Sequence, residues 1–360
     1  MSGINMAVVG VGALGRHHAR ILSELDHVNL IAVADPNPDN GRKVADAHQT
    51  EWLADYHRLL DGDYPLDAVC VAVPTSHHFS VATDFLSRGI PTLIEKPLAT
   101  NLEQAAELVA LADRHQAVLQ VGHVERFNPA TKAAFSLCEE PTYIHAERQS
   151  PFSYRSTDIG VVHDLMIHDI DLALSLVKSD VVHVEAFGVC LMGNLEDSVR
   201  ARVKFQNGCI GDFIANRVNP SSRRAMEIWS ASTRTLVDFT TREVVRYRPS
   251  ETLLYGTPPV ERAAQPGADI EQLKRDVFGT FLDVTAPDVA GDDALTAELL
   301  SFIEAVRFNG TPECDGRAAL AAMEVADRIL KSVNTHRWDG NAHGKIGPHF
   351  RLAKERKRAG

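Results

Sequence analysis

The pattern of hydrophobic and polar positions divides the chain near residue 125. Before that point, short apolar runs rich in β-branched residues alternate with stretches in which apolar residues recur at helical spacing. The runs predict strands at 4–9, 28–35, 66–74, 90–97 and 117–123, and the periodic stretches predict helices at 16–25, 51–60, 79–89 and 101–116. Strands that alternate with helices predict an α/β first domain, residues 1–124, with a doubly wound parallel sheet of the Rossmann type.

Residues 125–335 follow a different pattern and predict a second α/β domain. Glycine or polar turns separate β-like segments at 181–189, 198–208, 209–218, 225–232, 235–241 and 243–249. These segments predict a large, mostly antiparallel open sheet, with its clearest hairpin turn at 206–208. One face of such a sheet needs a cover, so we expect a homodimer or homotetramer through it.

The last hundred residues begin with an irregular stretch. Residues 251–290 are rich in Pro, Gly and Asp and predict a long excursion, for which contact with a neighbouring subunit is one role. Amphipathic helices are predicted at 294–310 and 316–333. The segment 336–360, which begins after Thr335, carries seven Lys and Arg residues but only two acidic residues. This composition predicts a basic, solvated tail.

A glycine motif follows the first predicted strand. Gly10, Gly12 and Gly15 form G-x-G-x-x-G between a strand and a helix, and a second strand ends at Asp35. This context indicates a dinucleotide site, with the pyrophosphate at the helix N-terminus. A carboxylate at Asp35 accepts hydrogen bonds from ribose hydroxyls and repels a 2′-phosphate, and the first basic residue after it is Arg42. We therefore expect NAD rather than NADP.

Polar residues also follow the other predicted strands of the first domain. Pro74, Lys96 and His123 lie at or just beyond strand ends, which in a parallel sheet meet at one edge where ligands bind. We predict cofactor contacts from the glycine loop and from these strand ends: Gly10, Gly12, Ala13, Leu14, Gly15, Asp35, Pro74, Thr75, His78, Glu95 and Lys96. For His78 an exposed helix start is equally compatible, and His123 is as compatible with a packed strand-end histidine as with a contact.

The stretch HDLMIHDID, residues 163–171, carries two histidines and three aspartates. On a helix, Asp164, His168 and Asp171 share one face, while His163 and Asp169 point elsewhere. A metal site, a structural helix surface and an acid–base pair are all compatible with that face. Because the first domain already supplies an NAD site and a lysine, we favour the acid–base pair and expect no metal.

Composition narrows the class of protein. The chain has 360 residues, a net charge of −11 and 44% apolar residues, so the body is not expected to bind nucleic acid. Five scattered cysteines without a C-x-x-C indicate neither a disulfide scaffold nor structural zinc. We found no apolar run of 18 residues and no signal-like start, so we expect a cytoplasmic protein without membrane association.

Four of these motifs together resemble a known family. VVGVGALGRHHA, VAVPTSHH, EKPLAT and the D-x-x-x-H helix occur in the order and spacing of the Gfo/Idh/MocA oxidoreductases, over about residues 4–335. The resemblance implies a Rossmann domain followed by an α/β domain with an open sheet, often in dimers or tetramers. It also implies that Lys96, Asp164 and His168 are catalytic. Either His168 or Lys96 would accept the hydroxyl proton, and the sequence leaves that choice open.

Within this family, residues 119–130 and 164–177 look most like the UDP-N-acetylglucosamine 3-dehydrogenases. That similarity implies oxidation of the 3-hydroxyl of a UDP-N-acetylhexosamine, with Arg126, Asn128, Tyr154, Arg155 and His168 as candidates for the substrate pocket. For Arg126, a salt bridge at the joint of the two domains is the alternative. An inositol or simple sugar dehydrogenase, an enzyme that passes through a transient 3-keto sugar, and a non-catalytic NAD-binding regulator are the competing functions. The joint presence of Lys96, Asp164 and His168 argues against the regulator.

Overall fold

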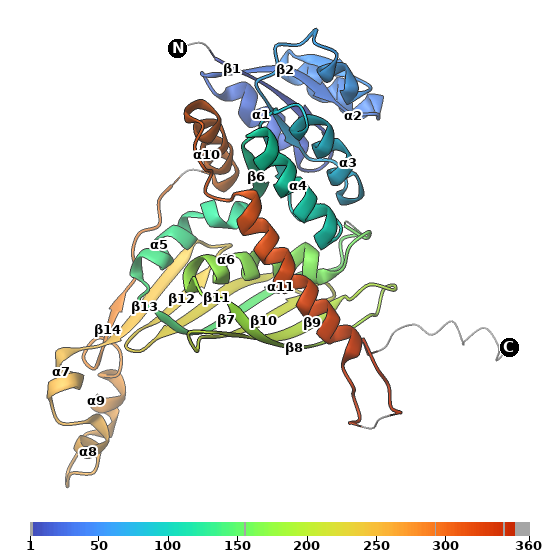
Figure 1. Ribbon diagram of the computed structural model, residues 1–360. Coiled ribbons are helices and arrows are strands. Elements are labelled where there is room, and N and C mark those ends of the chain that lie inside the picture. Colours follow the sequence, from blue (N-terminus) through green and yellow to red (C-terminus); the bar gives the residue numbers. More distant parts are fainter. Residues whose placement is uncertain (1–2, 155, 292, 341–342, 350–360) are drawn as a thin grey trace.

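A computed structural model describes residues 3–154, 156–291, 293–340 and 343–349. These residues form two sheets, one above the other in Figure 1. The upper sheet is six-stranded and parallel, in the spatial order β3 (Glu51–Leu53), β2 (Val28–Ala34), β1 (Ile4–Val9), β4 (Ala68–Val71), β5 (Thr92–Glu95), β6 (Leu119–Gly122). Its helices are α1 (Gly15–Glu24), α2 (Pro38–His48), η1 (Tyr56–Leu60), α3 (Thr75–Leu86) and α4 (Leu102–His115). The predicted Rossmann domain is confirmed.

The central strands of this sheet are buried on both faces, which explains their continuous apolar sequences. All four residues of β4 and of β5 are buried between helix layers. The helix predicted over 51–60 is wrong: Glu51–Leu53 pair with β2 as an edge strand, and a 3₁₀ turn follows. The Asp55 side chain accepts a hydrogen bond from the His57 backbone N–H, which caps that turn in place of a longer helix.

The second sheet is eight-stranded among the described residues and mostly antiparallel, as predicted. Its spatial order is β14 (Leu282–Thr285), β13 (Glu243–Pro249), β12 (Arg234–Asp238), β11 (Arg223–Ser230), β7 (Pro141–Gln149), β10 (Ile210–Asn216), β9 (Ser198–Phe205), β8 (Val181–Val189). The predicted hairpin joins β9 to β10, and Gly208 has the positive φ of 92° that its turn requires. We did not predict β7, which lies mid-sheet and pairs in parallel with β10.

Helices cover only one face of the second sheet, on the side toward the Rossmann domain (Figure 1). They include η2 (Val124–Phe127), α5 (Pro129–Leu137), the π-helix η3 (Val162–Met166), α6 (Ile167–Val177) and α11 (Gly316–Thr335). Residues 251–290 contain the short helices α7 (Glu251–Tyr255), α8 (Pro259–Ala263) and α9 (Ile270–Arg275), which project as an arm with no buried residue in any of the three. The opposite face of the sheet carries no helix among the described residues.

The C-terminal helices connect the two domains. α10 (Ala294–Phe308) returns to the first domain, where Leu299, Phe302 and Ile303 join the core formed by β1, β2 and α1. α11 runs down along both domains and ends at Thr335, the predicted start of the tail. After it, His349 pairs with the end of β8, donating to Gly188 and accepting from Cys190. Residues 350–360, which hold five of the seven basic residues of the predicted tail, lie outside the described residues.

Candidate active site

The glycine loop joins β1 to α1 with close packing at Gly10 and Gly15 and open space at Gly12. Gly10 adopts a φ of 84°, and a Cβ there would approach the backbone of Ala72 and Val73. A Cβ on Gly15 would collide with the Gly10 carbonyl oxygen, so this glycine permits close contact of helix and strand. Around Gly12, by contrast, no described atom lies within 4 Å of an added Cβ. The loop therefore leaves room for a pyrophosphate at the N-terminus of α1, as a dinucleotide requires.

Asp35 lies beside this loop at the end of β2. Its Oδ2 accepts a hydrogen bond from Val11 N at 2.9 Å, and its Oδ1 accepts one from Asn37 N at 2.8 Å. Arg42, the first basic residue after it, stacks over the Trp52 ring at 4.9 Å, and Trp52 in turn donates to the Asp35 carbonyl oxygen. The carboxylate is thus fixed beside the nucleotide loop, and the nearby guanidinium is engaged with an aromatic ring.

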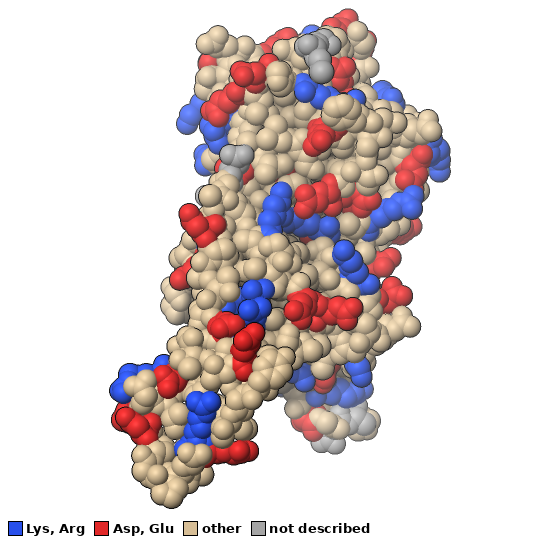
Figure 2. Space-filling view, turned by 90° about the vertical axis from the view of Figure 1, so that its left-hand side faces the viewer, with Lys and Arg blue, Asp and Glu red and all other residues tan. Residues whose placement is uncertain are grey.

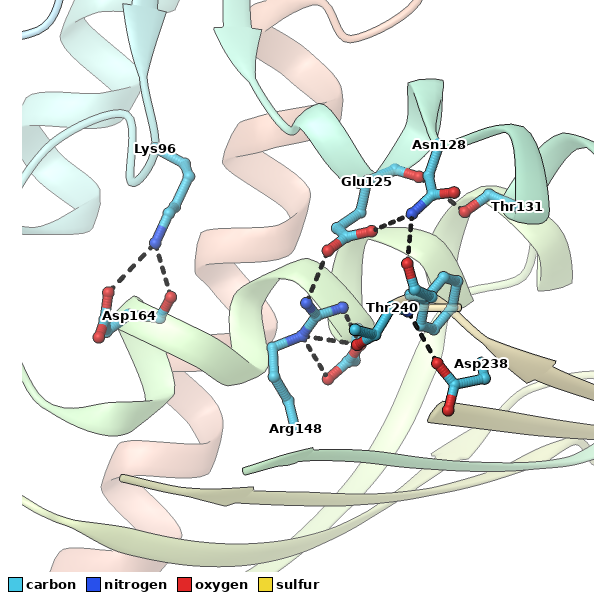
Figure 3. A network of polar contacts seen from close by, with 10 residues as sticks. Lys96, Glu125, Asn128, Thr131, Arg148, Asp164, Asp238 and Thr240 are labelled. Carbon is cyan, nitrogen blue, oxygen red and sulfur yellow. Dashed lines mark hydrogen bonds and ion pairs between the residues drawn. The ribbon is translucent and has the colours of Figure 1, made fainter. Parts of the chain in front are cut away.

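Lys96 connects the Rossmann domain to the helix that carries residues 163–171. Its Nζ donates to the Asp164 carbonyl oxygen at 2.6 Å and lies 3.3 Å from Asp164 Oδ1 (Figure 3). The lysine follows β5, and the Lys96–Pro97 peptide bond is cis. Both side chains are partly buried, with 14% and 22% of their surfaces exposed. Two predicted catalytic residues from different domains are therefore in direct contact.

The stretch 163–171 is not one regular α-helix. Val162–Met166 form a π-helical turn, and α6 begins at Ile167. Asp164, His168 and Asp171 nevertheless all face the first domain. Asp164 contacts Lys96, and the other two side chains face His123. The shared face that we predicted from helical spacing therefore survives the change in helix type.

His168 is almost fully buried beneath this contact. Only 9% of the residue is exposed, and its Nδ1 has no hydrogen-bond partner within the described ranges. Burial, reinforced by the positive charge of Lys96, lowers the pKa of His168 well below its usual value. The ring is therefore neutral at physiological pH and able to accept a proton.

Asp171 and Arg126 form a buried ion pair. The Nε and Nη2 atoms of Arg126 donate to the two carboxylate oxygens at 2.7 and 2.6 Å, and Nη1 donates to the Glu313 carbonyl oxygen. The guanidinium of this predicted substrate residue is thus bound within the chain, at the joint between the domains. Asn128 is likewise engaged, because it caps α5 through Ala130 N and donates to Glu125.

A second buried network, which we did not predict, surrounds Arg148 on β7. Its guanidinium donates to Asp169 and, at 2.8 Å, to Glu125 (Figure 3). Burial raises the pKa of Asp169 although the charge of Arg148 opposes it, so this carboxylate depends on its partner. A sequence signal was available: Ile144, Ala146 and Arg148 alternate along β7 on its buried face, where an arginine needs an anion.

A third network lies under the strand ends. His18 on α1 contacts Glu95 at 2.7 Å, and both are buried. Burial raises the pKa of the Glu95 carboxyl, but the His18 hydrogen bond and the charges of His18 and Lys96 outweigh burial and hold it below its usual value. Glu298 on α10 is completely buried nearby, and burial together with the charge of Glu95 raises its pKa well above its usual range. We predicted no role for His18 or Glu298 from the sequence.

The remaining predicted residues differ in how far they are buried. Ala13 and Leu14 are exposed on the glycine loop, and Pro74 and Thr75 form the start of α3 near it. His78 is buried, with its ring nitrogens 2.8 and 2.9 Å from the carbonyl oxygens of Pro97 and Val73, so its ring joins two strand-end loops. Tyr154 is 79% exposed in the loop before η3. Arg155 lies outside the described residues.

Comparison with known proteins identifies the family of both domains. Residues 4–123 match the oxidoreductase family with an NAD-binding Rossmann fold, and residues 135–233 match the Gfo/Idh/MocA C-terminal domain. The chain belongs to the Gfo/Idh/MocA oxidoreductases. It is 33% identical, over 91% of its own length and 96% of the relative's, to the UDP-N-acetylglucosamine 3-dehydrogenase of Acidithiobacillus ferrooxidans. A crystal form of that enzyme superimposes with a TM-score of 0.80 at 32% identity, over 92% of this chain and 98% of the other.

One less similar sequence and one less similar structure add to this comparison. The scyllo-inositol 2-dehydrogenase of Bacillus subtilis is 27% identical over 60% of this chain and 68% of its own length. A levoglucosan dehydrogenase in complex with NADH superimposes with a TM-score of 0.76 at 17% identity, covering 92% of this chain and 97% of the other. The predicted family, fold class and NAD cofactor are thus confirmed, and the protein is an NAD-dependent oxidoreductase.

The described residues also bear on metal binding and on membrane insertion. No group of three or more His, Cys, Asp or Glu side chains suited to a metal ion occurs in the described ranges. Within the same part of the chain, no helix is both long and apolar enough to cross a bilayer. On the face shown in Figure 2, acidic and basic side chains are interspersed in small groups of both signs.

Proposed function

We propose that this enzyme oxidises a ring hydroxyl of a sugar, specifically the 3-hydroxyl of a UDP-N-acetylhexosamine, to a ketone. The observation that carries the proposal is the 33% identity to a UDP-N-acetylglucosamine 3-dehydrogenase along nearly the whole of both chains. The placement of Lys96 and His168 at the strand edge beyond the glycine loop supports it, because a dehydrogenase needs a base beside its dinucleotide site.

His168 and Lys96 take different parts in the reaction because one is neutral and the other is charged. NAD, when bound along the glycine loop, supplies the nicotinamide ring that accepts the hydride. His168, neutral because it is buried beside Lys96, takes the hydroxyl proton. Lys96, held by Asp164, places positive charge where the alkoxide develops. We therefore assign the base to His168 and the stabilising charge to Lys96, a choice that the sequence left open.

The predicted substrate residues have different roles in this proposal. The polar groups of Arg126 and Asn128 are bound within the protein, so we assign them to the shape of the pocket and not to direct contact with a diphosphate. Tyr154, exposed in the loop before η3, and Arg155 remain our candidates for substrate contact. His168 touches the substrate as the base.

The test is the rate of NADH formation. It is followed by absorbance in the near ultraviolet, where only the reduced cofactor absorbs. Purified enzyme is supplied with NAD and, separately, UDP-N-acetylglucosamine, UDP-glucose, myo-inositol and free sugars. We expect turnover to be fastest with UDP-N-acetylglucosamine, with mass spectrometry showing loss of two hydrogens from the sugar. Turnover of inositol alone would favour the second candidate, which rests on the inositol dehydrogenases among the relatives. An absence of turnover with every nucleotide sugar would contradict the proposal.

We also propose that the enzyme is a homodimer or homotetramer through the uncovered face of the second sheet. Trp229 on β11 and Phe187 on β8 are 42% and 38% exposed, and a hollow of about 600 Å³ lies over β7, β11 and β12. Light scattering should give a multiple of the 39.4 kDa chain mass, and a monomer at all concentrations would contradict this. We further propose a cytoplasmic location, supported by the free thiols of Cys70, Cys138, Cys209 and Cys314.

A further inference from the structure

His123 lies at the junction of the two domains, between β6 and η2. It is 1% exposed, and neither of its ring nitrogens has a hydrogen-bond partner among the described residues. Each buried polar atom left unpaired costs about 1–3 kcal/mol. A phenylalanine, whose aromatic ring is somewhat larger, would carry no such cost. The ring therefore needs a partner in the working enzyme, and its neighbours show which one.

Two residues of α6 face the His123 ring. Its Nδ1 lies 3.8 Å from Asp171 Oδ2. The His168 ring meets it edge-on, with the ring centroids 6.4 Å apart and the planes at 88°. His168 Nδ1 is itself buried and unpaired within the same described part of the chain. Asp171, His123 and His168 thus form a series of carboxylate, imidazole and imidazole, with unpaired nitrogens at the inner contact.

The carboxylate at the end of this series is fixed. Arg126 holds both oxygens of Asp171, so the anion cannot turn away from His123. The other charges that face His123 are those of Arg126, Lys96 and Glu95, and the Cys314 thiol lies against its carbonyl oxygen. Burial lowers the pKa of His123 although Asp171 opposes it, so the ring is neutral and carries one N–H.

We propose that His123 is a positioning residue that acts through His168. Already in the ligand-free enzyme its Nδ1–H points to Asp171 and its Nε2 faces the Nδ1–H of His168, and both contacts shorten to hydrogen bonds when substrate binds. His168 is then held in the tautomer whose Nε2 is free to take the hydroxyl proton. When that proton arrives, the positive charge on His168 is shared through His123 with Asp171. The inference rests on the proposed role of His168 as base, but not on the identity of the sugar.

The tautomer of His168 tests the inference without any substrate. Nitrogen-15 NMR of histidine-labelled, ligand-free enzyme, assigned with a His168→Gln variant, should show His168 protonated at Nδ1. His123→Phe keeps an aromatic ring but offers no acceptor, and should move the proton to Nε2. His123→Gln can both donate to Asp171 and accept from His168, and should retain the Nδ1–H form. A wild-type His168 protonated at Nε2 would overturn the proposal even if a variant fails to fold.

Kinetics supply the second readout and the control. His123→Phe should lower kcat by about 10- to 100-fold with little change in KM, and His123→Gln should recover part of that loss. The matched control is His115→Phe at the exposed end of α4, which should change neither the tautomer nor kcat. An unchanged His168 spectrum in His123→Phe would overturn the inference. A tautomer shift without turnover of any nucleotide sugar would instead refute the proposed substrate and leave the role of His123 standing.

Discussion

The Nζ of Lys96 lies 2.6 Å from the carbonyl oxygen and 3.3 Å from the Oδ1 of Asp164, a residue 68 positions further along the chain. The lysine directly follows β5 of the Rossmann sheet, whereas the aspartate lies on the π-helical turn over the second sheet. This contact thus joins the Rossmann domain to the helical segment that carries residues 163–171. It also fixes the ammonium group close to His168, whose pKa falls because of burial and because of that charge.

Replacing Lys96 with methionine should nearly abolish turnover. Methionine keeps much of the side-chain volume but removes the charge that stabilises the alkoxide, so kcat should fall by at least about 100-fold. Binding of NAD should survive, because the glycine loop and Asp35 are untouched. Fluorescence titration with NADH and steady-state kinetics measure the two effects. Lys331→Met, at an exposed lysine on α11, is the matched control and should leave both unchanged. Normal activity in Lys96→Met would refute its catalytic role.

Replacing Asp35 with serine should relax the preference for NAD over NADP. The change removes a carboxylate that would repel a 2′-phosphate at the end of β2. The ratio of kcat/KM for NAD to kcat/KM for NADP should fall by about tenfold or more, equivalent to at least 1.4 kcal/mol. The Asp39→Ser variant removes a nearby carboxylate from the first turn of α2 and should leave the ratio unchanged. Equal ratios in wild type and Asp35→Ser would show that Asp35 does not contact the ribose.

The acid limb of the pH profile should lie below the pKa of an ordinary histidine. Because burial and Lys96 lower the pKa of His168 from 6.5, its ring stays neutral as the pH falls through that value, and the base is lost only at lower pH. The quantity to measure is kcat/KM across the range from about pH 5 to about pH 8, since it reports ionisations of the free enzyme. A limb centred at or above pH 6.5 would be inconsistent with a buried, neutral His168 as base.

Removing the Arg148 guanidinium should destabilise the fold strongly. Arg148→Met leaves Asp169 and Glu125 buried without their cation, and loss of one partner of a buried pair costs about 3–5 kcal/mol. The free energy of unfolding, from guanidinium titration, measures the loss. The exposed pair of Arg20 and Glu24 on α1 offers a control, because Arg20→Met should cost less than about 1 kcal/mol. Equal losses in the two variants would show that the buried network contributes no more than a surface pair.

Local sequence features predicted the parts of this enzyme that depend on neighbouring residues. Gly10, Gly12 and Gly15 indicated the nucleotide loop because a turn and a close approach to phosphate require glycine. The periodicity of 294–310 and 316–333 indicated α10 and α11, since each helix buries one face. The edge strand β3 was misassigned as helix because three residues carry too little periodicity to outweigh the apolar run around them.

The partners of the buried charged side chains lie far away in the sequence. The sequence by itself determined a Rossmann domain for NAD and a second sheet domain, and it indicated Lys96, Asp164 and His168 as the candidates for catalysis. Only the tertiary structure decided that Arg126 binds Asp171, that Arg148 joins Asp169 to Glu125, and that His123 lies against His168. The reason is physical: backbone periodicity sets which face a residue lies on, whereas the partner of a buried charge is set by the packing of whole elements.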